Sequence, residues 1–141
     1  MRKTLGLVSC AKSKKSYSCR AKEMYQDSDL FKKTYNYATK HYDYVAILSA
    51  KHGLLLPDKT IEAYDLTLKS MSGTAQKKWA ERVLKQMKNT LPMNEITTVF
   101  FHTGLLYRRY LRALLETQGI QCIVPLEGLG LGKQKAWYLN H

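Results

Sequence analysis

The chain has 141 residues, which is enough for one domain with a single hydrophobic core. Its composition, 45% apolar and 24% charged, excludes a disordered chain, and no apolar run approaches the roughly 18 residues of a membrane span. The formal net charge of +12 favours an anionic partner, of which nucleic acid is the commonest, while an anionic membrane surface or a phosphorylated small molecule stay open.

The three cysteines exclude a disulfide framework. Cys10, Cys19 and Cys122 are an odd number, lie far apart and lack the Cys/His spacing of a zinc site. The short apolar stretch that ends at Cys10 has no small-residue cleavage site and is followed by lysines, so it is typical of a buried strand, not of a signal peptide. We therefore expect a cytoplasmic protein with reduced thiols, no metal and no cofactor.

Strands and helices alternate along the chain. Four short runs rich in β-branched or aromatic residues predict strands buried on both faces, at residues 4–8, 44–48, 96–101 and 120–124. Between them, apolar stripes with helical spacing predict helices over residues 30–42, 75–91 and 107–115, and a short helix over residues 133–141. Ser28 or Asp29 is a candidate N-cap for the first helix, and Pro92 ends the second.

This alternation predicts one α/β domain over residues 1–141. We expect three layers, α/β/α, around a four-stranded parallel sheet with right-handed crossovers and strand order 2-1-3-4. Ligands bind beyond the carboxyl ends of the strands in such sheets. Each predicted strand is followed there by polar, ionisable or glycine-rich sequence, at residues 9–15, 49–53, 102–104 and 125–133.

Basic residues at these strand ends are candidates for binding phosphate, through side chains and backbone amides. The alternative is an ordinary solvated run of charge, and Cys10 is either a nucleophile or a small buried side chain. The candidates for phosphate or nucleic-acid binding are Ser9, Cys10, Lys12, Lys14, Lys15, Lys51, Arg108 and Lys133.

Two histidines and three carboxylates are candidates for catalysis. His52 lies in Lys-His-Gly after the second strand, and His102 ends the third, where an imidazole can hold or donate a proton. Glu62 and Asp65 lie in a loop of unusual length, and Glu127 follows the fourth strand. The alternatives are histidines bonded to loop carbonyls and acids that cap turns.

Aromatic and small residues complete the predicted site. Tyr25 and Tyr64 are candidates for stacking on an unpaired base, although Tyr64 can equally fill the core. Ser28 is a candidate pocket residue, and Gly128 and Gly130 permit a close backbone approach to a ligand or simply form a flexible turn. Their spacing is that of neither a dinucleotide fingerprint nor a Walker loop.

Five blocks in order resemble an uncharacterised bacterial and phage family, DUF6884. The blocks are Val8-Ser9-Cys10-x-Lys12-x-Lys14, Met24-Tyr25-x-x-Ser28-x-x-Phe31, residues 47–55, Glu62-x-Tyr64-Asp65 and residues 125–130. That family is similar to the core domain of archaeosine synthase, a tRNA-modifying enzyme, and distantly to the uracil-DNA glycosylase fold. The resemblance implies a base or nucleotide pocket.

The match to the motif of archaeosine synthase is incomplete. Cys10-x3-Lys14 and Tyr25-x2-Ser28 match its two halves, which extra residues separate here. Phe31 replaces its final histidine, and the water-activating and His-Pro-Ser blocks of uracil-DNA glycosylases are absent as such. The resemblance therefore implies the pocket more firmly than the reaction.

The leading prediction is an enzyme that acts on a nucleobase or nucleoside within DNA or RNA, by N-glycosidic cleavage, base exchange or modification. One alternative is a nucleic-acid-binding domain without catalysis that uses the same surface. Another is an enzyme on a free nucleotide or a small phosphorylated metabolite.

Overall fold

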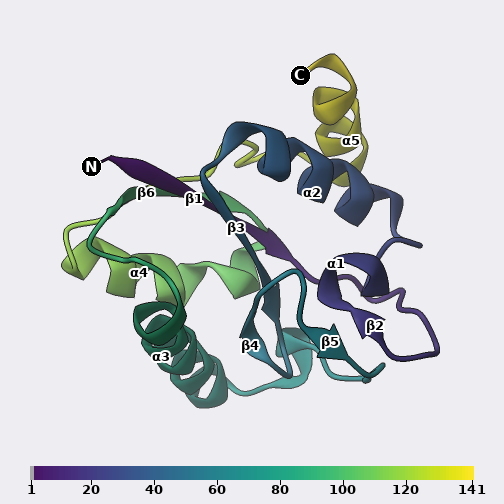
Figure 1. The fold of residues 1–141 in the computed structure, drawn as a ribbon, viewed down its shortest axis with the longest axis horizontal. Coiled ribbons are helices and arrows are strands. Elements are labelled where there is room, and N and C mark those ends of the chain that lie inside the picture. The colour runs from purple at the N-terminus through teal and green to yellow at the C-terminus, as the bar shows by residue number, and fades with distance from the viewer. Residues whose placement is uncertain (1) are drawn as a thin grey trace.

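The structure is a computed structural model that describes residues 2–141. A mixed five-stranded sheet forms its centre (Figure 1). The strands follow the order β4-β3-β1-β6-β7. Their bounds are Lys3–Ser9 for β1, Tyr44–Ser49 for β3, Gly53–Leu55 for β4, Ile96–His102 for β6 and Gln121–Ile123 for β7. A separate antiparallel ribbon joins β2 (Cys19–Arg20) to β5 (Thr60–Ile61).

The four strands predicted from the sequence are β1, β3, β6 and β7, and each pairs in parallel with its neighbour. The prediction of four strands is wrong in number, because β4 adds an antiparallel edge strand to β3. Gly53 has a positive φ of 72° and reverses the chain directly after β3, so residues 53–55 return along that strand. Three residues are too few for their pattern to predict a strand.

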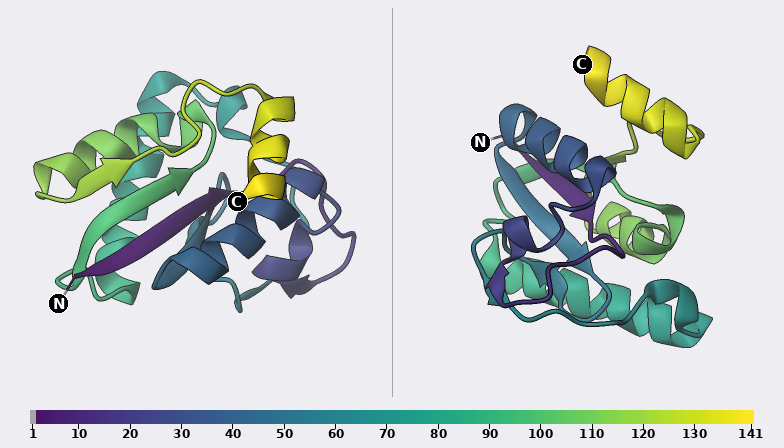
Figure 2. Two further views of the ribbon diagram at one scale, coloured as in Figure 1. Left: turned by 90° about the horizontal axis from the view of Figure 1, so that it is seen from above. Right: turned by 90° about the vertical axis from the view of Figure 1, so that its right-hand side faces the viewer.

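Helices cover both faces of the sheet (Figure 2). One face carries α2 (Asp29–His41), whose N-cap Ser28 accepts a hydrogen bond from the Phe31 amide. The other face carries α3 (Gly73–Thr90) and α4 (Arg109–Thr117). The remaining helices are α1 (Ala21–Met24), η1 (Leu68–Ser70), η2 (Leu105–Tyr107) and α5 (Leu131–Asn140).

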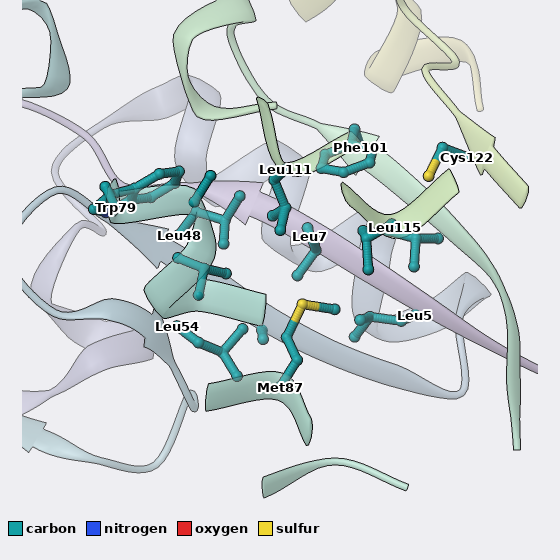
Figure 3. Close-up of a cluster of buried hydrophobic side chains, with 14 of the residues drawn as sticks. Leu5, Leu7, Leu48, Leu54, Trp79, Met87, Phe101, Leu111, Leu115 and Cys122 are labelled. Carbon is teal, nitrogen blue, oxygen red and sulfur yellow. The ribbon is translucent and has the colours of Figure 1, made fainter. Parts of the chain in front are cut away.

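Two hydrophobic cores, one on each face, hold these layers together. Leu5 and Leu7 of β1 pack with Met87 of α3 and Leu115 of α4 (Figure 3). Val8, one residue further along β1, points to the opposite face and packs in the core of α1 and α2. Each buried leucine or valine contributes about 1.5–3 kcal/mol of hydrophobic free energy, so the alternation along β1 fixes both layers.

The last helix, α5, has no buried residue, whereas α1, α2, α3 and α4 each bury at least two. It packs against α2 (Figure 2). Its bounds agree with the short helix predicted at the end of the chain. Within residues 2–141, no helix combines the length and the hydropathy needed to cross a bilayer.

Candidate functional site

A cavity of about 380 Å³ opens at the carboxyl ends of β1, β6 and β7. The connection from β1 to β3 runs through α2 on one face, and the connection from β6 to β7 runs through α4 on the other. The chain thus leaves the neighbouring strands β1 and β6 toward opposite faces, which opens a crevice between their ends. The first turns of α2, together with residues from the segment 124–129 and with Gln134 and Tyr138 of α5, form the remaining walls.

His102, the last residue of β6, lies in the wall of this cavity and is only 7% exposed. Its two ring nitrogens are engaged: Nε2 lies 2.5 Å from the Tyr42 hydroxyl and Nδ1 lies 2.7 Å from the Tyr138 hydroxyl. Burial, with a smaller contribution from His41, lowers the pKa of His102 to about 4. The imidazole is therefore neutral near pH 7 and positions Tyr138, a role different from the predicted proton transfer.

Thr103 follows His102 and also lines the cavity. Its Oγ1 is buried and has no hydrogen-bond partner among the described residues. Its carbonyl accepts a 2.6 Å hydrogen bond from Arg108, and the next amide, that of Gly104, donates to Ser9 Oγ at 3.3 Å. These bonds hold the turn after β6 in place, so the unpartnered hydroxyl is a fixed feature of the wall.

Arg108 and Glu127 form a charged rim. The Arg108 side chain is largely buried, and its guanidinium lies 3.8 Å from Glu127 Oε2. Arg112 reaches the same carboxylate oxygen at 3.7 Å. The Glu127 side chain is 60% exposed, so the carboxylate lies between the cavity and solvent with two cations beside it.

The contribution of α5 was missed by the sequence analysis. Tyr138 and Gln134 line the cavity, and Gln134 Nε2 donates to the Leu129 carbonyl at 2.8 Å. Trp137 packs edge-on against Tyr37 of α2, with ring centres 5.0 Å apart. Trp137 and Tyr138 are adjacent aromatic residues in a helix that is otherwise largely exposed, and aromatic side chains usually pack against a neighbouring element. This feature of the sequence could have predicted that α5 packs against α2.

The structure brings seven of the predicted site residues to this cavity: Ser9, Cys10, Ser28, His102, Arg108, Glu127 and Gly128. The Ser28 hydroxyl is already used as the helix cap. Cys10 Sγ lies 3.6 Å from the Tyr107 hydroxyl. Gly128 has a positive φ of 86°, which lets the segment after β7 turn into α5.

A second group of predicted residues lies at the end of β3 and does not line the cavity. The His52 ring meets Tyr64 edge-on at 5.4 Å, and Lys14 Nζ lies 4.6 Å above the Tyr64 ring. Burial, followed by the charges of Lys51, Arg82 and Lys59, lowers the pKa of His52. His102 therefore lines the cavity, whereas His52 lies outside it at the end of β3.

The predicted stacking role is wrong for Tyr25, whereas Tyr64 is partly buried and has Lys14 over its ring. Tyr25 has no exposed surface, and burial raises the pKa of its hydroxyl to about 12. That hydroxyl lies 2.6 Å from the hydroxyl of Tyr64, which in turn lies 2.8 Å from Ser49 Oγ. Lys14 Nζ lies over the face of the Tyr64 ring.

The remaining predicted residues do not line the cavity. Glu62 and Asp65 are exposed in the segment between β5 and η1, so the predicted catalytic roles of these two acids lose their geometric basis. Lys15 pairs with Asp27 at 2.8 Å, which raises the pKa of the lysine. Lys12, Lys51, Gly130 and Lys133 are exposed. No cluster of three or more potential metal ligands occurs within residues 2–141.

Comparison with known proteins gives a family but no characterised relative. The model of the family of unknown function DUF6884 matches residues 5–140. Neither the curated proteins nor the solved structures contain a significant match.

Proposed function

The chain thus belongs to DUF6884, a family of unknown function, and we propose from its site that it binds nucleic acid and takes one nucleoside into the cavity to cleave or exchange its N-glycosidic bond. The cavity at the ends of β1 and β6 carries this proposal. Its volume of about 380 Å³ lies within the range of small-molecule sites, about 300–1,000 Å³. The net charge of +12 attracts the polyanion to which such a nucleoside belongs.

The walls of the cavity suit a planar, uncharged group with hydrogen-bonding edges. Phe31, Phe101 and Leu126 supply apolar surface. Thr103 Oγ1 and the Tyr138 hydroxyl supply polar contacts, and His102 adds no charge because it is neutral. A nucleobase combines an apolar face with a polar edge, as these walls require.

Glu127 supplies the chemistry for the sugar. An N-glycosidic bond breaks through a transition state in which positive charge develops on the sugar ring. The rim carboxylate of Glu127 is suited to stabilise that charge and to orient a water molecule. In the hydrolytic form, a water oxygen bonds to the anomeric carbon, the bond to the base breaks, and the departing base takes up a proton. In exchange, an incoming base replaces water.

Binding without catalysis is the second candidate, and a specific observation favours it. Both ring nitrogens of His102 are already hydrogen-bonded, to the hydroxyls of Tyr42 and Tyr138. The imidazole is then not free to give a proton to a departing base. Under this alternative, the cavity holds a base without changing it.

The resemblance to archaeosine synthase and to the uracil-DNA glycosylase fold agrees with this proposal and stays a prediction. Phe31, which replaces the final histidine of the synthase motif, packs against Tyr25 with ring centres 5.1 Å apart and lines the cavity. That position therefore contributes apolar contact here, so the proposal does not include the synthase's own reaction.

Release of a free base from an oligonucleotide tests the proposal. We expect wild-type protein to produce abasic sites in single-stranded DNA or RNA of at least one base composition, including uracil and modified bases. Glu127→Gln should lower the rate about 10²–10³-fold, as expected for the loss of one charge that stabilises a transition state.

Glu116→Gln is the matched control. Glu116 pairs with the same Arg112 at 3.6 Å but does not line the cavity, so its loss should leave the rate within about twofold. Tight binding of oligonucleotides without any released or exchanged base would reject the enzyme in favour of the binding domain. Processing of free nucleotides alone would reject nucleic acid as the substrate.

A further inference from the structure

The turn between β3 and β4 is held rigidly by side chains from two elements. The His52 amide donates to Ser49 Oγ at 3.1 Å, and the His52 carbonyl accepts from Gln86 Nε2 of α3 at 2.9 Å. Gln86 Oε1 accepts a second hydrogen bond, from the backbone N–H of Leu54 at 2.8 Å. The positive φ of Gly53 completes the turn. His52 is therefore presented in one backbone conformation.

Cations surround this turn without acidic partners. Lys51, Lys59 and Arg82 all act on His52, and each of these charges lowers the pKa of the imidazole. Arg82 uses one nitrogen to donate to the Lys51 carbonyl at 3.0 Å. Lys14 lies over the Tyr64 ring on which the edge of His52 packs. None of these four cations takes part in an ion pair within residues 2–141.

The nearest acids in the sequence leave this charge uncompensated. Asp58, next to Lys59, is already paired with Arg20 and Lys22. Glu81, next to Arg82, is exposed, as are Glu62 and Asp65, and none of these three forms an ion pair in the described part of the chain. No carboxylate is among the groups that shift the pKa of His52. Cations that are gathered around a rigid turn repel one another, and a bound anion removes that repulsion.

A second, independent observation concerns the imidazole itself. His52 Nε2 is buried and has no hydrogen-bond partner among residues 2–141. Buried polar atoms in folded proteins nearly always have a partner, so an unpartnered one at a rigid turn points to a bound group outside the chain. The neutral imidazole can carry its proton on Nε2 and donate to an oxyanion.

We infer that the turn between β3 and β4 is a phosphate-binding site, in which Lys51, Arg82 and His52 Nε2 hold the oxygens of one phosphate group. The guanidinium of Arg82 has free N–H groups beyond the one given to Lys51, and phosphate oxygens accept several such bonds at once. Lys14 and Lys59 add long-range attraction. His52 is here a binding residue, different from its predicted role in catalysis.

One loop links this phosphate site to the cavity. The β1 loop carries Cys10, which lines the cavity, and four residues later Lys14, which lies over Tyr64. The ends of β1 and β3 are neighbours, since Ser9 is paired with Leu48. In the proposed function, the phosphate belongs to the strand whose base enters the cavity; this identification rests on that function, whereas the phosphate site itself does not.

The titration of His52 by NMR tests the inference, with His52→Asn used only to assign its ring signals. The probes are inorganic phosphate and, separately, a twelve-residue oligothymidylate. We expect either bound probe to raise the pKa of His52, because a negative charge favours the imidazolium. Inorganic phosphate could raise the pKa of His52 while the oligonucleotide does not bind. That result would support the phosphate site and identify a small phosphorylated molecule as the natural ligand. It would also reject the proposed nucleic-acid function.

The double variant Lys51→Gln, Arg82→Gln tests the cations. Its affinity for the oligonucleotide should fall at least about tenfold, and the salt dependence of log K should flatten by about 1.4, at about 0.7 for each lost contact to a single strand. The control is Lys40→Gln, Lys88→Gln, which removes the same charge from the C-terminal turns of α2 and α3. If the oligonucleotide binds without changing the titration of His52, and both double variants lose affinity equally, the phosphate site is refuted while nucleic-acid binding stands.

Discussion

Two buried polar atoms without partners, Thr103 Oγ1 and His52 Nε2, mark the two proposed binding sites. Thr103 is one of the residues that line the cavity, whereas His52 lies among uncompensated cations. A purely structural threonine at this place would have a partner for its hydroxyl, as Thr4 has in Asp43 at 3.1 Å. The difference between these two threonines can be measured.

Thr103→Val removes a hydroxyl that has no internal partner but keeps the shape of the side chain. We expect the free energy of unfolding to stay unchanged or to rise by about 1 kcal/mol, because no hydrogen bond is lost and the desolvation of a polar group is relieved. Thr4→Val, the control, should lose about 1 kcal/mol. Urea denaturation measures both. A clear loss for Thr103→Val would show that the hydroxyl contributes to folding.

His102 should make stability depend on pH. Its pKa is lowered from an ordinary 6.5 to about 4 in the folded protein, so its contribution is fully present at pH 7 and is lost as the pH falls toward 4. By pH 5 the free energy of unfolding should fall by about 2 kcal/mol. His102→Gln, which does not titrate, should be less stable at pH 7 but should show a smaller decrease between pH 7 and pH 5. Parallel curves for the two proteins would contradict this account.

At the scale of elements, β1 and α2 meet at a position that only glycine can occupy. A Cβ added to Gly6 would overlap the Tyr42 ring, which stacks on Phe100 at 4.6 Å and carries the hydroxyl that reaches His102. Gly6→Ala should therefore lower the free energy of unfolding by about 1–3 kcal/mol and weaken the contact to His102.

Gly132→Ala is the control for Gly6→Ala. A Cβ at Gly132, in the first turn of α5, meets nothing within 4 Å, and alanine favours helix. The substitution should be neutral or raise the free energy of unfolding by up to about 1 kcal/mol. Thermal unfolding of the two variants gives the comparison, and equal stability of both would refute the close contact at Gly6.

The attachment of α5 depends on few contacts, since none of its residues is fully buried. Tyr138→Phe removes the hydroxyl that lies 2.7 Å from His102 Nδ1. We expect amide hydrogen exchange in α5 to become about tenfold faster while exchange in the sheet stays unchanged. Leu139→Ala, at a 74% exposed position, should leave exchange in α5 unaltered. Unchanged exchange in Tyr138→Phe would mean that packing of Trp137 alone holds the helix.

Long runs were easier to predict than short or distant features. β1, β3 and β6 were predictable because they contain short runs rich in aliphatic, β-branched or aromatic residues, and the stripe that ends before Pro92 indicated α3. β4 was not, because Leu54 and Leu55 form too short a run after Gly53. His102, Arg108 and Glu127 were found because strand ends of one sheet converge. Tyr138 and Thr103 were missed because their roles arise from contacts between distant segments.

At the scale of the whole molecule, the residues that the sequence predicted for one site lie at two places, the cavity and the turn after β3. The cavity contains neutral or paired groups, whereas the unpaired cations gather at the neighbouring turn after β3. Under the proposed function, the phosphates of a polyanion are held at the turn after β3 while one of its bases is bound in the cavity. Phosphate contacts supply affinity, and contacts to a base supply selectivity.

Chemical-shift mapping with single-stranded oligonucleotides is the most direct test of a base in the cavity. Twelve-residue strands of each ordinary base, uracil included, are added to labelled protein. We expect at least one base to shift Thr103, His102 and Tyr138, and we expect Gly104→Trp to abolish these shifts. The tryptophan should fit there because a Cβ at Gly104 meets nothing within 4 Å and the residue lines the cavity. If every strand shifts only the lysine-rich turn and loop, and none shifts the cavity, the central claim is wrong.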